Sequence, residues 1–290
     1  VEDFRVPDRI VVGATDSMTA EVFLNVYADF TCPKLVTTPR TAEMIKYVSN
    51  SLLATMISFS NEIGNMCSAV PGVDARLVWK GVHLDRRLTP INGQVGGAAG
   101  VTEYLWHGLG FGGSCFPKDV AALRSFGRTV GEQTRMLDAV LDINADQPLR
   151  MVALLEKELS LAGKTVAVLG LAFKPGTDDL RESPALPLVA ELRKKGAKVL
   201  VHDPIAMPHA KKRPEFRDVV FAEDWAEALR KSDACCLVTA WPEYRSIQPT
   251  NFQKLMTRAL VIDGRGVFEP AAMAAAGVVW RGVGYTPEST

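Results

Sequence analysis

The sequence predicts an α/β protein in which a helical middle section precedes a doubly wound parallel sheet. From residue 164 onward, short apolar runs alternate with stretches at helical spacing, which is the pattern of parallel strands joined by crossover helices. Between residues 39 and 163 the apolar residues recur mainly at helical spacing. With 290 residues, the chain is long enough for more than one compact unit.

The first expected elements are a short strand and a long helix. The run RIVVGA (9–14) is typical of a buried strand, and Thr38 followed by Pro39 is a helix-start signal. We expect one helix from there to Cys67. Its apolar residues cover more than one stripe, so we expect it to be buried on several sides and to form a homodimer or higher homo-oligomer. These residues are Ile45, Val48, Leu52, Leu53, Met56, Ile57, Phe59 and Ile63.

The helical section continues on both sides of a glycine-rich loop. We expect a second helix over 73–82 and a loop over 89–104 that is too long for a simple turn. Helical spacing resumes at 118–127 and again over 136–159, where Pro148 is expected to kink or restart the helix. The changes of pattern place the expected domains at 1–38, 39–163 and 164–290.

The C-terminal section contains the β-rich runs KTVAVLG, AKVLVHDP, ACCLVTAW and ALVIDGRG, with the helical stretches ALPLVAELRKKG and AEDWAEALRKSD between them. The turn after TVAVLG lacks the GxGxxG pattern of an ordinary NAD site. Lys174, Arg181 and the helix start at Ser183 and Pro184 suit a nucleotide diphosphate instead, with a solvated charged loop as the alternative. Asp203 is expected to cap the next strand.

Composition excludes several classes of protein. Lysine plus arginine and aspartate plus glutamate both number 33, so the overall charge does not favour nucleic acid or an anionic membrane. No apolar run reaches the roughly 18 residues of a membrane span. The five cysteines lack metal-ligand or CxxC spacing and fit a reduced compartment. We therefore expect a cytoplasmic protein with no metal site, nucleic-acid partner or membrane contact.

Cys115 stands in GLGFGGSCFPKD (108–119). Because Pro117 fits the first position of a helix, Cys115 should lie just ahead of that helix, where unpaired N–H groups favour a thiolate. Gly112 and Gly113 would let the backbone approach a bound ligand. The alternative is a small buried hydrophobe, which we prefer for the other cysteines predicted to lie in a strand, Cys235 and Cys236.

Charged residues could assist such a thiol. Lys118 and Asp119 follow it directly in the sequence. Lys46 and Asn50 are spaced i, i+4 and therefore share one face of the long helix. Polar groups on an apolar helix need partners, so Lys46 and Asn50 either form a structural pair at an interface or line a site.

Four motifs in consistent order, GFGGSCFPKD, AEMIKYVSNSLLAT, GLAFKPGTDDLRESPA and VIDGRG, resemble the UDP-glucose/GDP-mannose dehydrogenases over nearly the whole chain. The resemblance implies a central helical dimerisation domain and a C-terminal Rossmann-like domain that binds the nucleotide sugar. It also implies NAD-dependent, four-electron oxidation of the C6 alcohol of a nucleotide-linked hexose to a carboxylate. UDP-glucose is favoured, while GDP-mannose and a thymidine-linked glucose stay open.

The resemblance implies a role for each catalytic candidate. Cys115 would add to the intermediate aldehyde as a thiohemiacetal, which is oxidised to a thioester and then hydrolysed. Lys46 would stabilise the developing oxyanion, Asn50 would help to hold it, and Asp119 would assist the water or the lysine.

The resemblance also implies residues that bind the substrate and the cofactor. Arg87 would reach in from a partner subunit, and Arg181 would face the NAD. The other implied substrate contacts are Tyr104, Gly108, Gly110, Phe111, Gly112, Phe173, Lys174 and Arg265.

The chain departs from the family in lacking an N-terminal GxGxxG turn. We expect residues 1–38 to be the tail of the NAD-binding domain, and the chain alone to be inactive or nearly so. One alternative is a nucleotide-sugar-binding dimerisation module without catalysis. Another is a phosphogluconate-type hydroxyacid dehydrogenase, which shares a Lys-x-x-x-Asn pair but needs no thiol.

Overall fold

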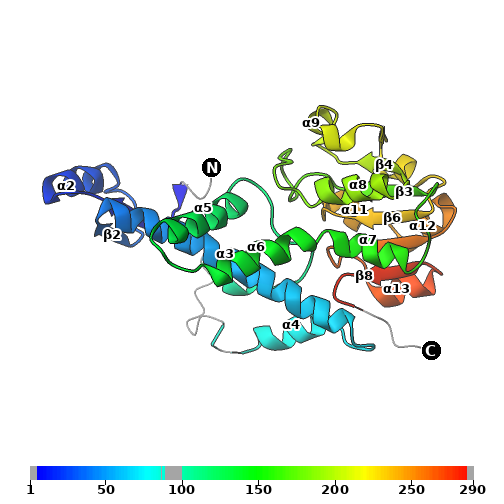
Figure 1. Ribbon diagram of the computed structural model, residues 1–290, viewed down its shortest axis with the longest axis horizontal. Helices are drawn as coiled ribbons and strands as arrows, with labels where there is room; N and C mark the ends of the chain where they lie inside the picture. Colours follow the sequence, from blue (N-terminus) through cyan, green and yellow to red (C-terminus); the bar gives the residue numbers. More distant parts are fainter. Residues whose placement is uncertain (1–4, 86, 89–99, 286–290) are drawn as a thin grey trace.

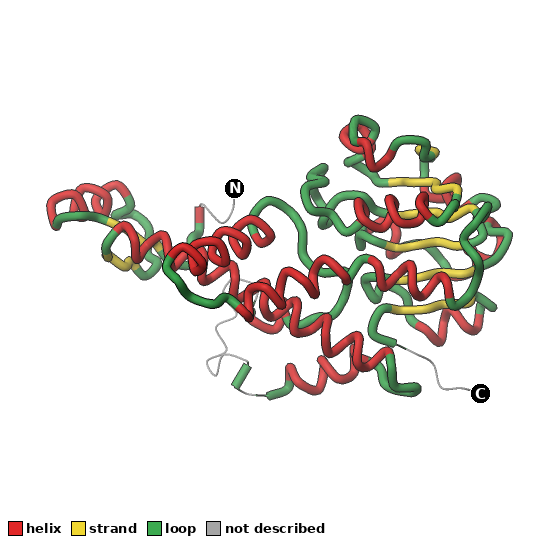
Figure 2. The backbone as a smooth tube through the Cα atoms, in the orientation of Figure 1, coloured by secondary structure: helices red, strands yellow, loops and turns green. Residues whose placement is uncertain are grey.

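The computed structural model describes residues 5–85, 87–88 and 100–285. A long helical part extends from a compact unit built around a parallel sheet (Figure 1). The strands of that sheet lie side by side at one end of the molecule, with helices packed around them (Figure 2). The architecture confirms the predicted α/β class.

A small parallel βαβ unit forms the N-terminal end. Strands β1 (Ile10–Gly13) and β2 (Lys34–Thr37) pair in parallel and are joined by helix α2 (Ser17–Val26). Asp16 caps α2 by accepting a 2.8 Å hydrogen bond from the N–H of Thr19. Strand β1 was predicted, whereas β2 and α2 were missed. Most apolar side chains of α2 face solvent and only Ala20 is buried, so the helix has little core of its own.

The long helix α3 (Pro39–Ser68) begins after Thr38, whose hydroxyl accepts a hydrogen bond from the N–H of Thr41. The predicted start and length are confirmed. We predicted burial on several sides, as at a subunit or domain interface; in the single chain Val48, Leu52 and Phe59 are about half exposed, so that interface stays a prediction. The face that packs against the neighbouring helices is lined instead by small residues such as Ala54.

The remaining helices of this part are α4 (Ala75–His83), the 3-10 turn η1 (Val101–Tyr104), α5 (Phe116–Thr129), α6 (Arg135–Asp146) and α7 (Leu149–Glu156). Helices α5 and α6 pack on α3 and on each other. Pro148 lies between α6 and α7, so the predicted restart is confirmed. Most of the predicted loop over 89–104 lies outside the described residues.

The C-terminal sheet is parallel throughout, in the order β5-β4-β3-β6-β7-β8. The four predicted strands are β3 (Thr165–Leu169), β4 (Lys198–His202), β6 (Ala234–Leu237) and β7 (Leu260–Asp263), and the edges add β5 (Val220–Phe221) and β8 (Val279–Gly282). The helices are α8 (Ala185–Lys194), α9 (Met207–Ala210), α10 (Trp225–Leu229), α11 (Pro242–Arg245), α12 (Pro249–Leu255) and α13 (Pro270–Ala275), with η2 (Pro214–Phe216).

The chain order reverses between β3 and β6, since successive strands are added outward on either side of this pair. In such sheets, ligands bind in the crevice outside the carboxyl ends of the strands at this switch point. The loops that follow β3, β6 and β7 therefore frame the expected binding edge.

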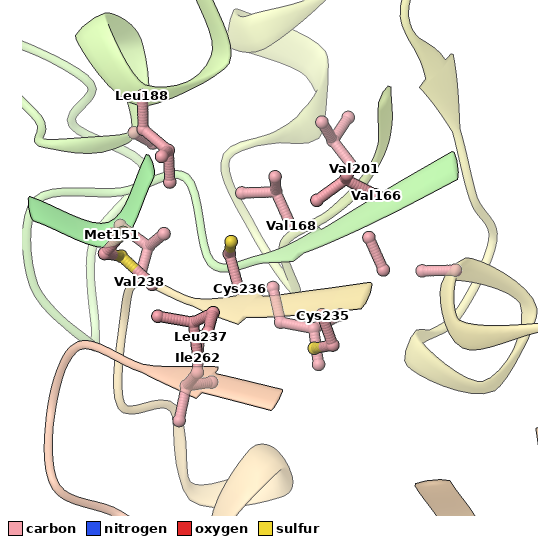
Figure 3. Packing of buried hydrophobic residues seen from close by; sticks show 14 of the residues in the cluster. Met151, Val166, Val168, Leu188, Val201, Cys235, Cys236, Leu237, Val238 and Ile262 are labelled. Carbon is pink, nitrogen blue, oxygen red and sulfur yellow. The ribbon is translucent and has the colours of Figure 1, made fainter. Parts of the chain in front are cut away.

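The central strand β6 forms the middle of the hydrophobic core. Its adjacent residues Cys235 and Cys236 are fully buried, and their side chains point to opposite faces of the sheet (Figure 3). Met151 from α7 belongs to the same cluster and joins the helical part to the sheet. Burial raises the pKa of both thiols well above the ordinary value. The two cysteines are core residues, as predicted.

Among the described residues, no helix combines the length and the apolar character needed to cross a membrane.

Candidate active site

Cys115 directly precedes the first residue of α5 and is exposed to solvent. Pro117 is at the second helical position, one residue later than predicted. The carbonyl oxygen of Cys115 accepts a 2.8 Å hydrogen bond from the N–H of Asp119, so the thiol stands at the N-terminal end of this helix. The positive end of the helix dipole therefore faces negative charge that develops at this position.

Asp119 forms hydrogen bonds with the other catalytic candidates, Lys46 and Asn50. Its side chain is fully buried, and one carboxylate oxygen accepts hydrogen bonds from Lys46 and from Asn50, the latter at 2.6 Å. The other oxygen accepts a 2.5 Å hydrogen bond from Lys118. Burial raises the pKa of Asp119, but the hydrogen bonds from Lys118, Lys46 and Asn50 outweigh it and the pKa is lowered. The structure thus joins α3 and α5 through an ionised carboxylate one turn from Cys115.

Two cations lie within electrostatic range of the thiol. The hydrogen bond to Asp119 raises the pKa of Lys118, and Cys115 contributes a smaller effect of the same sign. The hydrogen bond to Asp179 likewise raises the pKa of Arg181, with Cys115 again among the smaller causes. Negative charge that develops near Cys115 would therefore meet two positive side chains.

The glycines before Cys115 allow two parts of the chain to approach each other closely. A Cβ on Gly112 would lie 2.3 Å from the carbonyl oxygen of Glu182. Gly113 has a φ of 79°, and a Cβ there would lie 2.9 Å from the ring of Phe173. Sequence reasoning expected the glycines to admit a ligand. In the described residues, the space beside Gly112 and Gly113 is filled by the protein's own segment after β3.

That segment also carries two predicted binding residues. Lys174 places its ammonium 5.5 Å from the centroid of the Phe173 ring. Arg181 is exposed and forms a 2.7 Å ion pair with Asp179, while its carbonyl oxygen accepts a hydrogen bond from the N–H of Gly113. Phe173, Lys174 and Arg181 are therefore brought to the loop that carries Cys115.

An aromatic group flanks the start of α5. The ring of Phe116 lies 5.9 Å from that of Phe111 and 6.3 Å from that of Tyr104, between ring centroids. Tyr104, which the sequence placed in the substrate pocket, thus lies beside the residue that follows Cys115.

The segment 108–113, here called the glycine loop, contains four glycines. Arg265 lies at its other end, where a Cβ on Gly108 would be 3.7 Å from the guanidinium of Arg265. Its Nε donates a 2.7 Å hydrogen bond to the carbonyl oxygen of Val238. Burial lowers the pKa of Arg265 to about 10, and Asp263 acts in the opposite direction. No carboxylate of the described residues is within ion-pair distance of Arg265, so its charge is free to meet an anion.

A cleft of about 480 Å³ opens beside Arg265, within the usual size of ligand pockets. Arg76 and Lys80 line it from α4, and Arg76 forms ion pairs with Asp74 and Glu269 of the same lining. Burial lowers the pKa of His107, another lining residue, to about 4. Its Nδ1 has no hydrogen-bond partner in the described part of the chain.

Arg87 is not brought to this site. Its side chain is 89% exposed and forms an ion pair with Asp85 on the same turn. No contact within residues 5–85, 87–88 and 100–285 links Arg87 to Cys115.

The turn after β3 does not fit a dinucleotide. The N–H groups of Leu171 and Ala172 both donate to the buried carboxylate of Asp203, at 2.7 and 3.0 Å. A pyrophosphate needs free N–H groups at this place. The same carboxylate also accepts a hydrogen bond from the indole of Trp241. Asp203 is therefore a structural residue, as predicted, and the residues present do not form an NAD site at this turn.

Sequence reasoning missed four amide side chains, on α3 and at the C-terminal end of α6, that hold the loop before Cys115 directly or through one another. These are Asn61, Asn65, Asn144 and Gln147. The available signal was the helical spacing of each pair, i, i+4 for Asn61 and Asn65 and i, i+3 for Asn144 and Gln147.

Comparison with known proteins gives the family. Residues 40–146 match the central domain of the UDP-glucose/GDP-mannose dehydrogenase family, and residues 167–270 match its UDP binding domain. The chain belongs to this family. Family members with similar sequences include UDP-glucose 6-dehydrogenase TuaD of Bacillus subtilis, 37% identical over 282 residues, and UDP-glucose 6-dehydrogenase AglM of Haloferax volcanii, 41% identical over 272 residues. These alignments cover 96% and 92% of this chain.

A solved family structure shares the fold. A UDP-glucose dehydrogenase from the archaeon Pyrobaculum islandicum superposes with a TM-score of 0.85 at 40% identity, covering 98% of this chain and 60% of that one. The two curated relatives are matched over 57% and 59% of their own length. This chain therefore spans about three fifths of these relatives.

Proposed function

We propose that the whole protein is an NAD-dependent nucleotide-sugar 6-dehydrogenase and that this chain provides its nucleophile and much of its substrate pocket. The observation that supports this most directly is the position of Cys115, one helical turn before a buried carboxylate that holds Lys46 and Asn50. UDP-glucose is the substrate we favour, because the curated relatives are UDP-glucose 6-dehydrogenases.

The chemistry needs a nucleophile at the aldehyde stage, because an aldehyde carbon has no hydride to give until an addition makes it tetrahedral. The thiolate of Cys115 adds to the C6 carbon and leaves negative charge on its oxygen. Lys46, whose side chain is about half exposed, stabilises that oxyanion together with Asn50. Asp119 holds both donors in place and assists the water that later attacks the thioester.

The substrate lies along the seam between the glycine loop and the sheet. The free charge of Arg265 suits the diphosphate, and Lys174 adds a second cation beside Phe173. The match of residues 167–270 to a UDP binding domain favours a nucleotide sugar over a hydroxyacid. Tyr104, Gly108, Gly110, Phe111 and Gly112 complete the proposed pocket.

The turn after β3 does not hold the NAD, because Asp203 occupies the N–H groups that a pyrophosphate would need. The exposed Arg181 faces the cofactor instead. Strands β1 and β2 form a sheet of only two strands, and isolated pairs of short strands are marginal in water. This supports the proposal that they belong to a larger domain. Residues 1–38 are then the tail of the cofactor domain.

The active assembly is a homo-oligomer in the cytoplasm. The exposed apolar side chains of α3, among them Leu52, Phe59 and Met66, suit a second copy of the helix better than water. Arg87 would then reach the partner's site. All five cysteines are free thiols, which suits a reduced compartment.

Counting NADH per sugar oxidised by the full-length protein tests the proposal. We expect two, because two oxidations occur before the product is released. A ratio of one, or a Cys115→Ser variant that forms acid normally, would contradict the thioester scheme.

The reactivity of Cys115 in the 290-residue chain distinguishes a catalytic fragment from a module that only binds the nucleotide sugar. We expect iodoacetamide to label Cys115 faster than the half-buried Cys32, and UDP-glucose to protect it. If the chain binds UDP-glucose but its Cys115 has ordinary reactivity, it is a binding and dimerisation module.

A further inference from the structure

Four amide side chains, two of them fully buried and two half-buried, surround the loop that leads to the proposed nucleophile, and the proposed function gives them no role. We propose that Asn61, Asn65, Asn144 and Gln147, together the amide clamp, position this loop and so place Cys115 for attack. The inference rests on the proposed role of Cys115 and names positioning residues for the same reaction.

Asn144 pairs with the backbone as a second strand would. Its Oδ1 accepts a 2.7 Å hydrogen bond from the N–H of Phe111, and its Nδ2 donates at 3.0 Å to the carbonyl oxygen of the same residue. Gly110 has a φ of 81°, and a Cβ there would lie 2.3 Å from Oδ1 of Asn144. The glycine therefore gives the amide access to the next peptide group.

Gly108 is held in a similar way by two other helical residues. Its N–H donates a 2.7 Å hydrogen bond to Oδ1 of Asn61, and its carbonyl oxygen accepts one of 2.7 Å from Nε2 of Gln147. Asn61 and Gln147 are fully buried. Nδ2 of Asn65 donates at 3.0 Å to Oε1 of Gln147, which fixes the orientation of that amide.

The clamp replaces the regular structure that the loop lacks. Residues 105–115 form no helix or strand, and the run from 108 to 113 contains four glycines, so an unsupported loop would sample many conformations. The clamp satisfies the N–H and the carbonyl oxygen of both Gly108 and Phe111. Cys115 follows within one short segment, so its place relative to Arg265 and Phe173 depends on these bonds.

Removing the side-chain amide of Asn144, which bonds both the N–H and the carbonyl oxygen of Phe111, tests the clamp. In the full-length protein we expect Asn144→Ala to lower kcat roughly tenfold or more with a small change in KM, because misplacement of a reacting group costs rate. Asn144→Asp keeps the acceptor for the N–H of Phe111 and should recover part of that loss. The matched control is Asn251→Ala, which removes an amide that caps α12 far along the chain.

Alkylation of Cys115 in the 290-residue chain provides a readout that does not need NAD. We expect Asn144→Ala to weaken the protection of Cys115 by UDP-glucose, while Asn251→Ala retains it. A folded Asn144→Ala variant with wild-type kcat and protection would overturn the clamp. If that variant does not fold, Asn144→Asp and Gln147→Glu decide by the same two measurements, and wild-type values in both overturn it.

The two proposals fail separately. Wild-type Cys115 that is no more reactive than Cys32 contradicts the proposed function. A reactive and protected wild-type thiol with unaffected clamp variants contradicts the clamp alone.

Discussion

The backbone N–H of Gly113 donates a 2.8 Å hydrogen bond to the carbonyl oxygen of Arg181. This bond ties the loop that carries Cys115 to the segment after β3, and it joins the helical part of the molecule to the sheet. The neighbouring Gly112 leaves no room between the two segments. The geometry of the proposed pocket therefore depends on a backbone contact that any side chain at position 112 would disturb.

Gly112→Ala should reduce the free energy of unfolding by about 1–3 kcal/mol, because its Cβ would overlap the carbonyl oxygen of Glu182 and backbone must move. Urea unfolding measures the effect. The control is Gly81→Ala in α4, where the added Cβ meets no atom within 4 Å, and a gain of about 0.5–1 kcal/mol is expected. Equal stability of Gly112→Ala and wild type would show that the segments at Gly112 and Glu182 can move apart at no cost in free energy.

Asp119→Asn should lower stability by about 1–3 kcal/mol at pH 7, because Lys46 and Lys118 lose their charged acceptor. The pKa of Asp119 is lowered in the folded state, so its contribution is present above its ordinary value of 3.8 and is lost as pH falls through the folded value. The difference in unfolding free energy between variant and wild type should therefore be constant above about pH 4 and shrink as the pH falls below 3.8. The exposed Asp29→Asn is the control, and a difference independent of pH would refute the ionic explanation.

His107 should make the protein less stable in mild acid. Burial holds its folded pKa at about 4, below the ordinary value near 6.5, so the unfolded state binds more protons between these values. Stability then rises with pH across this window, by up to about 3 kcal/mol from this residue. His107→Leu should flatten the slope of stability against pH. An unaltered slope in His107→Leu would assign the acid sensitivity to other groups.

Cys236→Ser should cost about 1–3 kcal/mol, because the new hydroxyl would be buried in β6 among apolar neighbours. Cys115→Ser should change stability by less than about 0.5 kcal/mol, since that side chain is exposed. Thermal or urea unfolding of the two variants compares the same substitution in two environments. A large loss in Cys115→Ser would mean that the thiol has a structural function.

Local sequence patterns predicted much of the fold and part of the site. The alternation of β-rich and helical runs predicted β3, β4, β6 and β7, because each strand and each crossover helix has its own period. Pro117 placed Cys115 ahead of α5, and helical spacing placed Lys46 beside Asn50. Each of these predictions depends on residues only a few positions apart.

Relationships between distant residues could not be predicted in this way. Asn144 and Phe111 are 33 positions apart, and Asn65 and Gln147 are 82 apart, so no local pattern contains both partners. The glycines before Cys115 gave a correct signal of close approach, but they do not say whether a ligand or Glu182 comes close. Helix α2 was missed because its apolar side chains have little core to face in this chain.

The length of α3 has an evolutionary consequence. The helix presents Asn50 to Asp119 and, about three turns later, Asn61 to Gly108. One inserted residue between them would rotate the second contact by roughly 100° and shift it by about 1.5 Å relative to the first. Single-codon insertions or deletions in this stretch of the gene would therefore separate the Asn50–Asp119 contact from the Asn61–Gly108 contact.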